Sequence, residues 1–305
     1  MLSSILTQAG YTTGMYTSPH LLQVNERMKI NGIDISNEEL LTLAESVRLA
    51  VEEMSDPPTE FERITAMALL YFQRRACQVV VLEVGLGGRL DATNVIPAPD
   101  AAVIANIALE HTAVLGNTLE QIAREKAGII KKGSSVVLYR QGPSVEAVVR
   151  DVCQQQGASL FVTDPARGRT VSRTLEGQTL NYRDRNHLFL PLPGAYQAKN
   201  AFAALEAVDA LVREKGYRIS EEAIRRGVAL VRWPGRLEVL RHDPLVLVDG
   251  AHNPDGVEAL TASLKEYFSK KRLTFVMGVM ADKNYVEMLR MVTPLARRFI
   301  TVTPE

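Results

Sequence analysis

The sequence predicts a two-domain α/β protein whose first and larger domain is built on a mostly parallel, doubly wound sheet. Two continuous apolar runs, residues 78–84 and 101–107, are typical of strands buried on both faces of such a sheet. Segments with helical spacing alternate with runs of this kind up to residue 162. The chain has 305 residues. A single domain usually has roughly 100–200 residues, so we expect two domains.

Composition and charge favour a protein that acts on small molecules. Hydrophobic residues make up 46% of the chain and charged residues 23%, which is ordinary for a globular protein. The 35 Lys and Arg residues balance 35 Asp and Glu residues, so no net basic field would attract nucleic acid. No run of about 18 apolar residues is present, which argues against a membrane span. The only cysteines are Cys77 and Cys153, and a disulfide is disfavoured because Cys77 opens an apolar run, so we expect a cytoplasmic location.

The first expected elements are a helix end, a short strand, two helices and the first buried strand, at residues 2–10, 11–17, 38–54, 59–75 and 78–84. Gly10 stands where a helix C-terminus favours glycine. Pro19 stops regular strand pairing and leaves Ser18 and His20 at a strand end. A Pro-Pro pair separates the two helices.

The alternation continues with a strand, a helix, a strand, a helix and a strand, at residues 101–107, 118–130, 134–139, 144–156 and 159–162. Thr118 is the expected N-cap of the first of these helices, with Gln121 as its capping-box partner. The polar segment 164–192 breaks the rhythm and suits an antiparallel flap. Helices are expected again at residues 197–215 and 220–231.

The segment Trp233-Pro234-Gly235-Arg236 predicts a linker, because Pro and Gly stand together between two ordered runs. Beyond it a second α/β unit begins, with elements expected at residues 245–248, 254–268, 273–279, 285–292 and 298–302. We therefore expect a first domain at residues 1–233 and a second at residues 234–305.

The segment E-V-G-L-G-G-R-L-D-A-T-N, residues 83–94, is the most informative motif. It follows an apolar strand, and ligands bind beyond the carboxyl ends of strands in open parallel sheets. Glu83 and Asp91 would then face a crevice, with glycines that permit close backbone approach. The alternative is a glycine turn with a solvated acid. The run lacks the G-x-G-x-x-G spacing of a dinucleotide site, which disfavours an NAD-dependent enzyme.

A second segment, A-L-E-H-T, also follows a buried strand. Three of the five histidines, His20, His111 and His252, stand at the ends of apolar strands, where a shared crevice would lie. The alternative for a lone histidine is a structural role, which is commoner. Mg²⁺ prefers oxygen ligands, so Glu83 and the hydroxyl group of Ser18 suit this ion better than an imidazole does.

Two further segments contain candidate site residues, and each also has a simple structural explanation. Lys126 lies on an amphipathic helix, where exposed lysines are ordinarily solvated. In L-V-D-G-A-H-N-P, Asp249 could accept hydrogen bonds from ribose, and His252 or Asn253 could contact a base or phosphate. The alternative is a capping turn with Asn253 as the helix N-cap. Arg236 offers a planar cation suited to phosphate.

Seven segments, taken together and in this order, resemble folylpolyglutamate synthase and dihydrofolate synthase, relatives of the Mur peptide ligases. They are Y-T-S-P-H-L, E-V-G-L-G-G-R-L-D-A-T-N, E-H-T-x-x-L-G, E-K-A-G-I-I, Y-Q-x-x-N-A, W-P-G-R-L-E and D-G-A-H-N-P. One match of this kind is weak, whereas seven in sequence order are highly specific.

The resemblance implies a Mur-ligase-like central ATPase domain with a mostly parallel sheet, followed by a partial Rossmann-like C-terminal domain. It also implies ligation of L-glutamate to dihydropteroate or (tetrahydro)folate through an acyl phosphate formed from ATP. The expected cofactors are Mg²⁺ and ATP. The expected partners are small-molecule substrates, without nucleic acid or membrane, and we expect a monomer.

The resemblance also assigns roles to individual residues. The Mg²⁺ positions of the family match Ser18, Glu83 and His111. Lys126 matches a lysine that is carbamylated to help hold a second metal ion, so Lys126 and His111 are the expected catalytic residues. The residues that contact ATP in the family match Asn200, Arg236, Asp249 and His252.

The sequence departs from the family pattern at both ends. The family places a loop of the form G-T-N-G-K-G-S before the helix that ends at Gly10, and no G-x-x-x-x-G-K-[ST] occurs here. The C-terminal domain of the family also continues past Glu305. We therefore expect a truncated chain with weak or no activity. The alternatives are an inactive remnant that binds folate or a partner, and a Mur-type peptide ligase.

Overall fold

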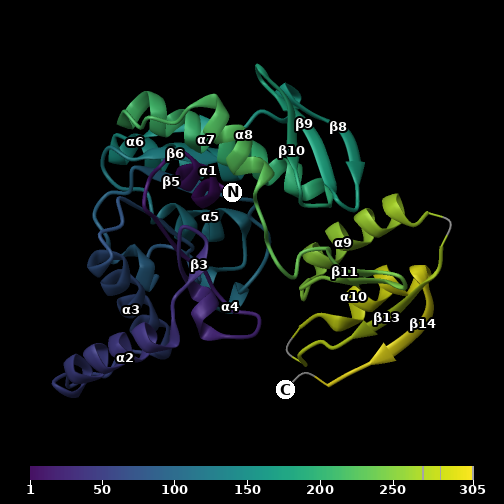
Figure 1. Ribbon diagram of the computed structural model, residues 1–305, viewed down its shortest axis with the longest axis horizontal. Coiled ribbons are helices and arrows are strands. Elements are labelled where there is room, and N and C mark those ends of the chain that lie inside the picture. The colour runs from purple at the N-terminus through teal and green to yellow at the C-terminus, as the bar shows by residue number, and fades with distance from the viewer. Residues whose placement is uncertain (270, 282, 304–305) are drawn as a thin grey trace. The chain divides into compact units, whose positions relative to one another are not determined.

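Figure 1 shows the computed structural model, which describes residues 1–269, 271–281 and 283–303. Packing divides the chain into two compact units. Unit 1 comprises Met1–Pro165 and Ala201–Val228, and unit 2 comprises Ala166–Asn200 and the residues from Ala229 onward. Packing thus assigns the segment 166–200 to unit 2, and a division of the sequence after residue 233 stays a prediction.

Unit 1 alternates strands and helices, and its parallel strands lie in two sheets. The elements are α1 (Leu2–Gln8), β1 (Thr13–Tyr16), β2 (Met28–Ile30), β3 (Ile33–Asp34), α2 (Asn37–Glu52), α3 (Glu60–Arg74), β4 (Val79–Leu82), β5 (Ala101–Ile104), α4 (Thr112–Leu115), α5 (Leu119–Ala127), β6 (Ser135–Leu138), α6 (Pro143–Gln156), β7 (Ser159–Val162), α7 (Ala195–Lys215, which begins in unit 2) and α8 (Glu221–Ala229). The sheet orders are β3-β2-β1-β4 and β5-β6-β7. Strand β1 runs parallel to β4 and antiparallel to β2, whereas β5, β6 and β7 are all parallel.

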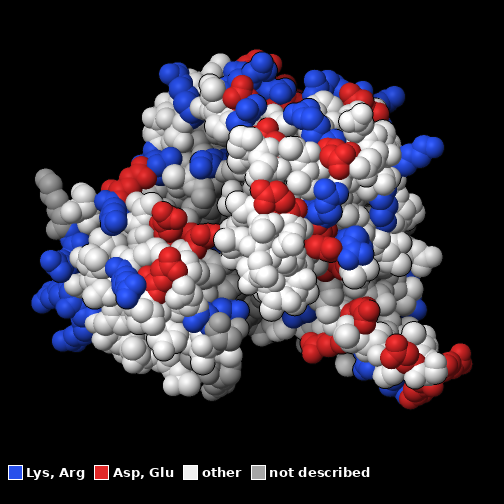
Figure 2. Space-filling view, turned by 180° about the vertical axis from the view of Figure 1, so that it is seen from behind, with Lys and Arg blue, Asp and Glu red and all other residues white. Residues whose placement is uncertain are grey.

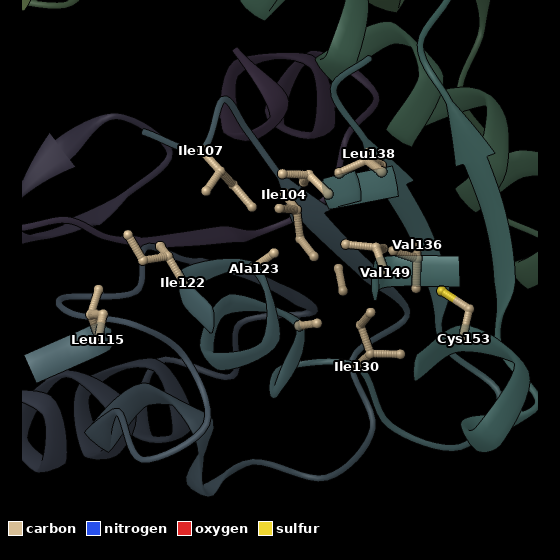
Figure 3. Packing of buried hydrophobic residues seen from close by; sticks show 13 residues of the cluster. Ile104, Ile107, Leu115, Ile122, Ala123, Ile130, Val136, Leu138, Val149 and Cys153 are labelled. Atoms are coloured by element: carbon tan, nitrogen blue, oxygen red, sulfur yellow. The ribbon is translucent and has the colours of Figure 1, made fainter. Parts of the chain in front are cut away.

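Helices cover both faces of the sheet β5-β6-β7, and strand β6 shows why. Because alternate side chains point to opposite faces, Val136 and Leu138 face one side and Val137 the other. The first two pack with α5 and α6, through residues such as Ile122 and Val149 (Figure 3). Val137 packs against an alanine face of α7. Burial on both faces explains the unbroken apolar sequence of this strand.

The other sheet of unit 1 packs against α2 and α3. Tyr16 of β1 and Met28 of β2 are fully buried in one cluster with Ala68 and Phe72 of α3. Thr59 begins α3 with a capping box, in which its side chain accepts from Glu62 N–H and the Glu62 carboxylate accepts from Thr59 N–H. The end of β1, at Tyr16, therefore packs against a helix with a well-defined N-terminus.

Unit 2 contains an antiparallel sheet and smaller α/β elements. They are β8 (Gly168–Thr174), β9 (Gly177–Tyr182), β10 (Arg185–Leu190), β11 (Glu238–His242), β12 (Leu245–Val248), α9 (Pro254–Tyr267), β13 (Leu273–Met277), α10 (Tyr285–Val292) and β14 (Ala296–Thr301). The antiparallel flap expected at 164–192 is confirmed as β10-β9-β8. Strands β11 and β12 form an antiparallel pair, whereas β13 and β14 pair in parallel around α10. The α/β character expected of both parts of the chain is confirmed.

The surface charges and the helices agree with the balanced charge and with the lack of a long apolar run in the sequence. Acidic and basic side chains are interspersed on the face of the molecule in Figure 2. In the part of the chain that the structure describes, no helix is both long and apolar enough to cross a bilayer.

Candidate functional site

A small cavity in unit 1 gathers the glycine-rich turn, the end of β5 and the end of α5. Its volume is about 150 Å³, and residues 84–87 of the turn form one wall. His111 and Lys126 line the same cavity, as do Asn106 and Glu110. The structure therefore brings together two of the expected site residues, one a cation and one an imidazole, at the carboxyl end of a parallel strand.

The glycine-rich turn lies directly on the end of the helix that carries Lys126. A Cβ atom on Gly88 would lie 2.9 Å from the carbonyl oxygens of Glu125 and Lys126, so a side chain at residue 88 would separate the two segments. On the other side of the contact, a Cβ atom on Gly128 would lie 2.5 Å from Arg89 Cα. These two glycines allow the close approach that places Lys126 beside the turn.

Hydrogen bonds fix the same contact. Arg89 N–H donates to Glu125 O at 2.9 Å, and the Arg89 guanidinium group pairs with the Glu125 carboxylate at 3.0 Å. The Asn94 side chain donates to Arg89 O and Gly128 O, both at 3.1 Å. Asp91 accepts from Leu86 N–H at 2.8 Å and from Thr93. The Asp91 carboxylate therefore connects the two ends of the glycine-rich turn, which is a structural role.

Ser18 and Glu83 meet because their strands are parallel neighbours. Tyr16 of β1 is paired with Leu82 of β4, so both chains leave the sheet at the same edge. Glu83 N–H donates to Tyr16 O at 2.9 Å, and Ser18 N–H donates to Glu83 Oε2 at 2.9 Å. The backbone of Ser18 and the carboxylate of Glu83 are thus held together, with Glu83 at the surface.

The loop after Ser18 is organised by one carboxylate. Glu26 accepts hydrogen bonds from the N–H groups of Leu21, Leu22 and Gln23, each at 2.8 Å. These bonds, that from Leu21 first, lower the pKa of the Glu26 carboxyl below its ordinary value. Within the same loop, Arg27 Nε donates to His20 Nδ1 at 2.9 Å. The Nδ1 lone pair of His20 is therefore already used.

We expect the order of this loop to depend on pH through Glu26. Because the folded-state pKa is lowered, the contribution of the carboxylate is complete above its ordinary pKa of about 4.5 and is lost as the pH falls through the folded-state value. Amide hydrogen exchange at residues 21–23, corrected for intrinsic rates, should lose protection over that acidic range. In Glu26→Ala, which has no side-chain acceptor, the protection should be low at every pH.

The matched control is Glu62→Ala, which removes the carboxylate of a capping box on α3 and leaves the loop untouched. Its loop amides should titrate as in the unchanged chain. Constant protection of residues 21–23 between pH 6 and the acid limit of folding would contradict the role given to Glu26.

His111 adopts an uncommon backbone conformation at the cavity. Its φ is 50° and its ψ is 38°, in the left-handed region, immediately before α4. Its carbonyl oxygen accepts from Val114 N–H and Leu115 N–H, both at 2.9 Å, which satisfies the start of that short helix. The conformation turns the chain sharply after β5, and the His111 side chain lines the cavity as a result.

Of the predicted metal ligands, His111 lines the cavity, whereas Ser18 and Glu83 do not. Within residues 1–269, 271–281 and 283–303, no three His, Cys, Asp or Glu side chains are grouped closely enough to hold a metal ion by themselves. Mg²⁺ is usually bound through one or two carboxylates, with waters and substrate phosphates completing the shell. The carboxylate of Glu83, with the hydroxyl group that Ser18 carries, is a donor set of that kind. The imidazole of His111 is the least suited of the three predicted ligands.

A second group of expected residues is gathered in unit 2 around Asp249. Asp249 Oδ2 accepts from Leu237 N–H and Oδ1 accepts from Ala251 N–H, each at 2.8 Å. Burial raises the pKa of this half-buried carboxyl, whereas the two N–H donors and the charge of Arg236 act in the opposite direction. The Arg236 side chain itself is exposed. The geometry thus gives Asp249 two main-chain partners and leaves the guanidinium group at the surface.

His252, Asn253 and Asn200 complete the expected set in unit 2. His252 Nδ1 lies 2.9 Å from Gly250 O, so the ring donates this hydrogen bond through Nδ1, and His252 is exposed. Asn253 is the N-cap of α9, because its side chain accepts from Gly256 N–H at 2.7 Å. Asn200 donates to Gln197 Oε1 at 3.2 Å from the exposed side of α7.

Three residues of these two groups were not singled out from the sequence. Tyr196 interacts electrostatically with Asp249 and Arg236, and burial, followed by Asp249, raises its pKa to about 12. Asn106 and Glu110 line the cavity of unit 1. A signal was present for each, since Tyr196 and Glu110 belong to the motifs Y-Q-x-x-N-A and E-H-T, and Asn106 is a polar residue near the end of an apolar strand.

Comparison with known families and proteins agrees with this geometry. The family model described as the Mur ligase middle domain matches residues 10–208, and the model of the Mur ligase glutamate ligase domain matches residues 235–305. A dihydrofolate synthase/folylpolyglutamate synthase of Bacillus subtilis is 37% identical over 97% of this chain and 71% of its own length. The corresponding protein of Escherichia coli is 38% identical over 93% of this chain and 64% of its own length.

Solved structures give the same result. A complex of folylpolyglutamate synthase with AMPPCP and folate superposes with a TM-score of 0.91 at 35% identity, over 100% of this chain and 76% of the other. Folylpolyglutamate synthase of Thermotoga maritima has a TM-score of 0.88 at 36% identity, over 98% of this chain and 70% of the other. The chain therefore belongs to the folylpolyglutamate and dihydrofolate synthases of the Mur ligase family.

Proposed function

We propose that this chain is an ATP-dependent ligase that joins L-glutamate to dihydropteroate, to folates or to both. The observation that carries the proposal is the pair Ser18 and Glu83, held together by a 2.9 Å hydrogen bond where two parallel strands end. Oxygen donors at that place suit a magnesium-bound nucleotide. The proposal is supported by the names of the relatives and by the similarity to a complex with AMPPCP and folate.

The reaction follows from the chemistry of amide formation. A carboxylate oxygen of the pteroate or folate attacks the γ-phosphorus of ATP, which forms an acyl phosphate and releases ADP. The amine of L-glutamate then attacks the acyl carbon, the C–O bond to phosphate breaks, and the amine loses a proton. Inorganic phosphate leaves with the bonding electron pair, so no covalent intermediate with the enzyme is needed.

The residues of the chain contribute binding and charge. We assign Ser18 and Glu83 to hold Mg²⁺, with His111 as a third position, and Lys126 to a second metal position as a carbamate. When bound, Mg²⁺ offsets negative charge on the phosphoryl oxygens. We assign Arg236 to a phosphate group of the nucleotide, and Asn200, Asp249 and His252 to nucleotide binding. Fixed donors of this kind act where charge develops in the transition state.

The test is a product assay with the purified 305-residue chain, Mg²⁺, ATP and L-glutamate. Dihydropteroate and tetrahydrofolate are supplied separately, and mass spectrometry should detect an acceptor that carries one more glutamyl residue, with one ADP per product. The two acceptors separate dihydrofolate synthase from folylpolyglutamate synthase activity. The weak activity expected from the sequence stays a prediction, which the rate in this assay tests.

The controls remove one component at a time. ADP release should require both the acceptor and L-glutamate for turnover, and Glu83→Gln should give no detectable product while its circular dichroism is unchanged. A folded chain that glutamylates neither acceptor, or that glutamylates a peptidoglycan precursor instead, would refute the proposed function.

The location follows from the same chemistry. We propose the cytoplasm, where ATP is available and where the two free cysteines, Cys77 and Cys153, would remain reduced. Fractionation of cells that express a tagged chain would test this location.

A further inference from the structure

The backbone on both sides of Arg236 is held by carboxylates. Glu238 Oε2 accepts from Gly235 N–H at 2.8 Å, and Asp249 Oδ2 accepts from Leu237 N–H at 2.8 Å. Gly235 O in turn accepts from Gly250 N–H at 2.8 Å. The residue before Arg236 and the residue after it are therefore both fixed, while the guanidinium group remains exposed.

The conformation of this loop is one that the chain would not adopt without support. Leu237 has a φ of 49°, in the left-handed region that a branched side chain disfavours, and it is only 1% exposed. Its side chain packs with Leu264 of α9 and with Phe268, which follows that helix. Such a backbone persists where its surroundings determine it, and such places are commonly binding or catalytic sites.

Glu238 itself is a poor candidate for direct contact with a nucleotide. Its charge would repel phosphate, and its Oε2 atom is already bonded to the main chain at Gly235. A carboxylate acts as an acceptor, and a hydrogen bond from a backbone N–H to an ionised group is stronger than one between neutral groups. The effect of Glu238 on a bound anion would therefore pass through the loop.

We propose that Glu238 is a positioning residue, which holds Gly235 so that the guanidinium group of Arg236 is presented to a phosphate group of the nucleotide. This inference rests on the proposed function, because it takes a nucleotide as the ligand. It gives a role to Glu238, the last residue of the motif W-P-G-R-L-E, to which the sequence had assigned none. Asp249 does the same for the other side of the loop through Leu237.

A double-mutant cycle with the full chain tests the proposal. The dissociation constant for Mg–ATP is measured by calorimetry for the unchanged chain, Glu238→Ala, Arg236→Ala and the double variant. Loss of a hydrogen bond to a charged group should weaken binding about tenfold in Glu238→Ala. In the Arg236→Ala background the same change should have no more than about a twofold effect, because the group being positioned is gone.

The conservative variant separates a hydrogen bond from a charge. Glu238→Gln keeps a side-chain carbonyl oxygen that can accept from Gly235 N–H, so its affinity for Mg–ATP should lie within about twofold of the unchanged chain. Amide exchange provides a readout that needs no ligand. The Gly235 amide should exchange faster in Glu238→Ala, whereas the Leu237 amide, which is bonded to Asp249, should remain protected.

The outcomes separate the two proposals. Equal weakening by Glu238→Ala with and without Arg236 would overturn the positioning role, and so would unchanged affinity in Glu238→Ala when the unchanged chain binds. If the folded, unchanged chain bound no Mg–ATP, both the proposed function and this inference would fall. Weakening that disappears without Arg236, with recovery in Glu238→Gln, would establish the role.

Discussion

Replacing Lys126 with alanine is expected to lower kcat of the ligase by roughly 10²–10³-fold, a loss typical of removing one group that stabilises transition-state charge. The physical reason is the position of Lys126, which lines the cavity formed with His111 and the glycine-rich turn. Lys126→Arg should not restore activity, because a guanidinium group cannot form the carbamate that we assign to this position. Single-turnover measurement of ADP formation, with the acceptor present, separates this effect from binding.

Lys132→Ala is the matched control, since Lys132 is an exposed lysine just beyond the same helix and does not line the cavity. It should retain the full rate. The carbamate can be observed directly, because ¹³C-labelled bicarbonate should give a carbamate signal in the unchanged chain that is absent from Lys126→Ala. Partial recovery of Lys126→Ala by added acetate would show that a carboxylate is what the position supplies. A Lys126→Ala chain with normal kcat would exclude the assigned role.

Gly128→Ala is expected to destabilise the fold by about 1–3 kcal/mol, the usual cost of forcing an extra atom into a close-packed contact. The new Cβ atom would lie 2.4 Å from Arg89 Cβ and 2.5 Å from Arg89 Cα, so the backbone of the turn would have to move. Gly128 has a φ of −62°, which alanine adopts freely, so backbone strain does not contribute. Urea unfolding, followed by circular dichroism, measures the change as a lower midpoint at constant slope.

Gly142→Ala provides the comparison, because Gly142 has a φ of −60° and a Cβ atom there would meet nothing within 4 Å. The only expected cost is that of a poorer N-cap on α6, about 1 kcal/mol or less. Gly128→Ala should also lower kcat, since the displaced turn shares the cavity with Lys126. Equal free energies of unfolding for Gly128→Ala and Gly142→Ala would show that the turn accommodates the extra methyl group without loss of stability, contrary to this prediction.

The elements of the fold that could be predicted are those with strong local signals. The apolar strands expected at 78–84 and 101–107 are confirmed as β4 and β5, although both are shorter than expected. The expected burial on both faces is wrong for β5, because Ala102 and Ile104 are buried whereas Val103 between them is exposed, and every residue of β4 is only partly buried. Thr118 is confirmed as an N-cap, since it accepts from Gln121 N–H at 3.2 Å. The expected capping box is wrong in one detail, because the Gln121 side chain accepts from Asn117 N–H instead of the N-cap residue.

The hairpin β2-β3 was not predicted, although its turn has a clear signature. Asn31 and Gly32 both have positive φ, 50° and 82°, and an Asn-Gly pair is the strongest short-range signal for a hairpin turn. The strands on either side are only three and two residues long, so no alternating pattern could develop. Their pairing depends on β1, which is distant in the sequence and supplies the sheet edge.

The candidate site could be predicted as a set of strand ends, but its internal contacts could not. Ser18 and Glu83 closely follow β1 and β4, as expected, whereas β5 ends earlier than expected and His111 lies at the far end of the loop after it. Which strands are neighbours is a property of the whole sheet, so the hydrogen bond from Ser18 N–H to Glu83 could not be foreseen from either motif. The double main-chain contact of Asp249 was hidden for the same reason, since its partner Leu237 lies in a different motif.

The two groups of site residues differ in how their contacts must form during folding. The contact of Ser18 with Glu83 joins residues 65 positions apart, whereas the contacts that hold Arg236 join residues 3 and 12 positions apart. Closing a longer loop costs more chain entropy, and contacts distant in sequence form more slowly. The loop around Arg236 can therefore form early within its own hairpin. The contact between Ser18 and Glu83 can form only after β1 and β4 have paired. The ability to hold the metal ion would therefore arise later on the folding pathway.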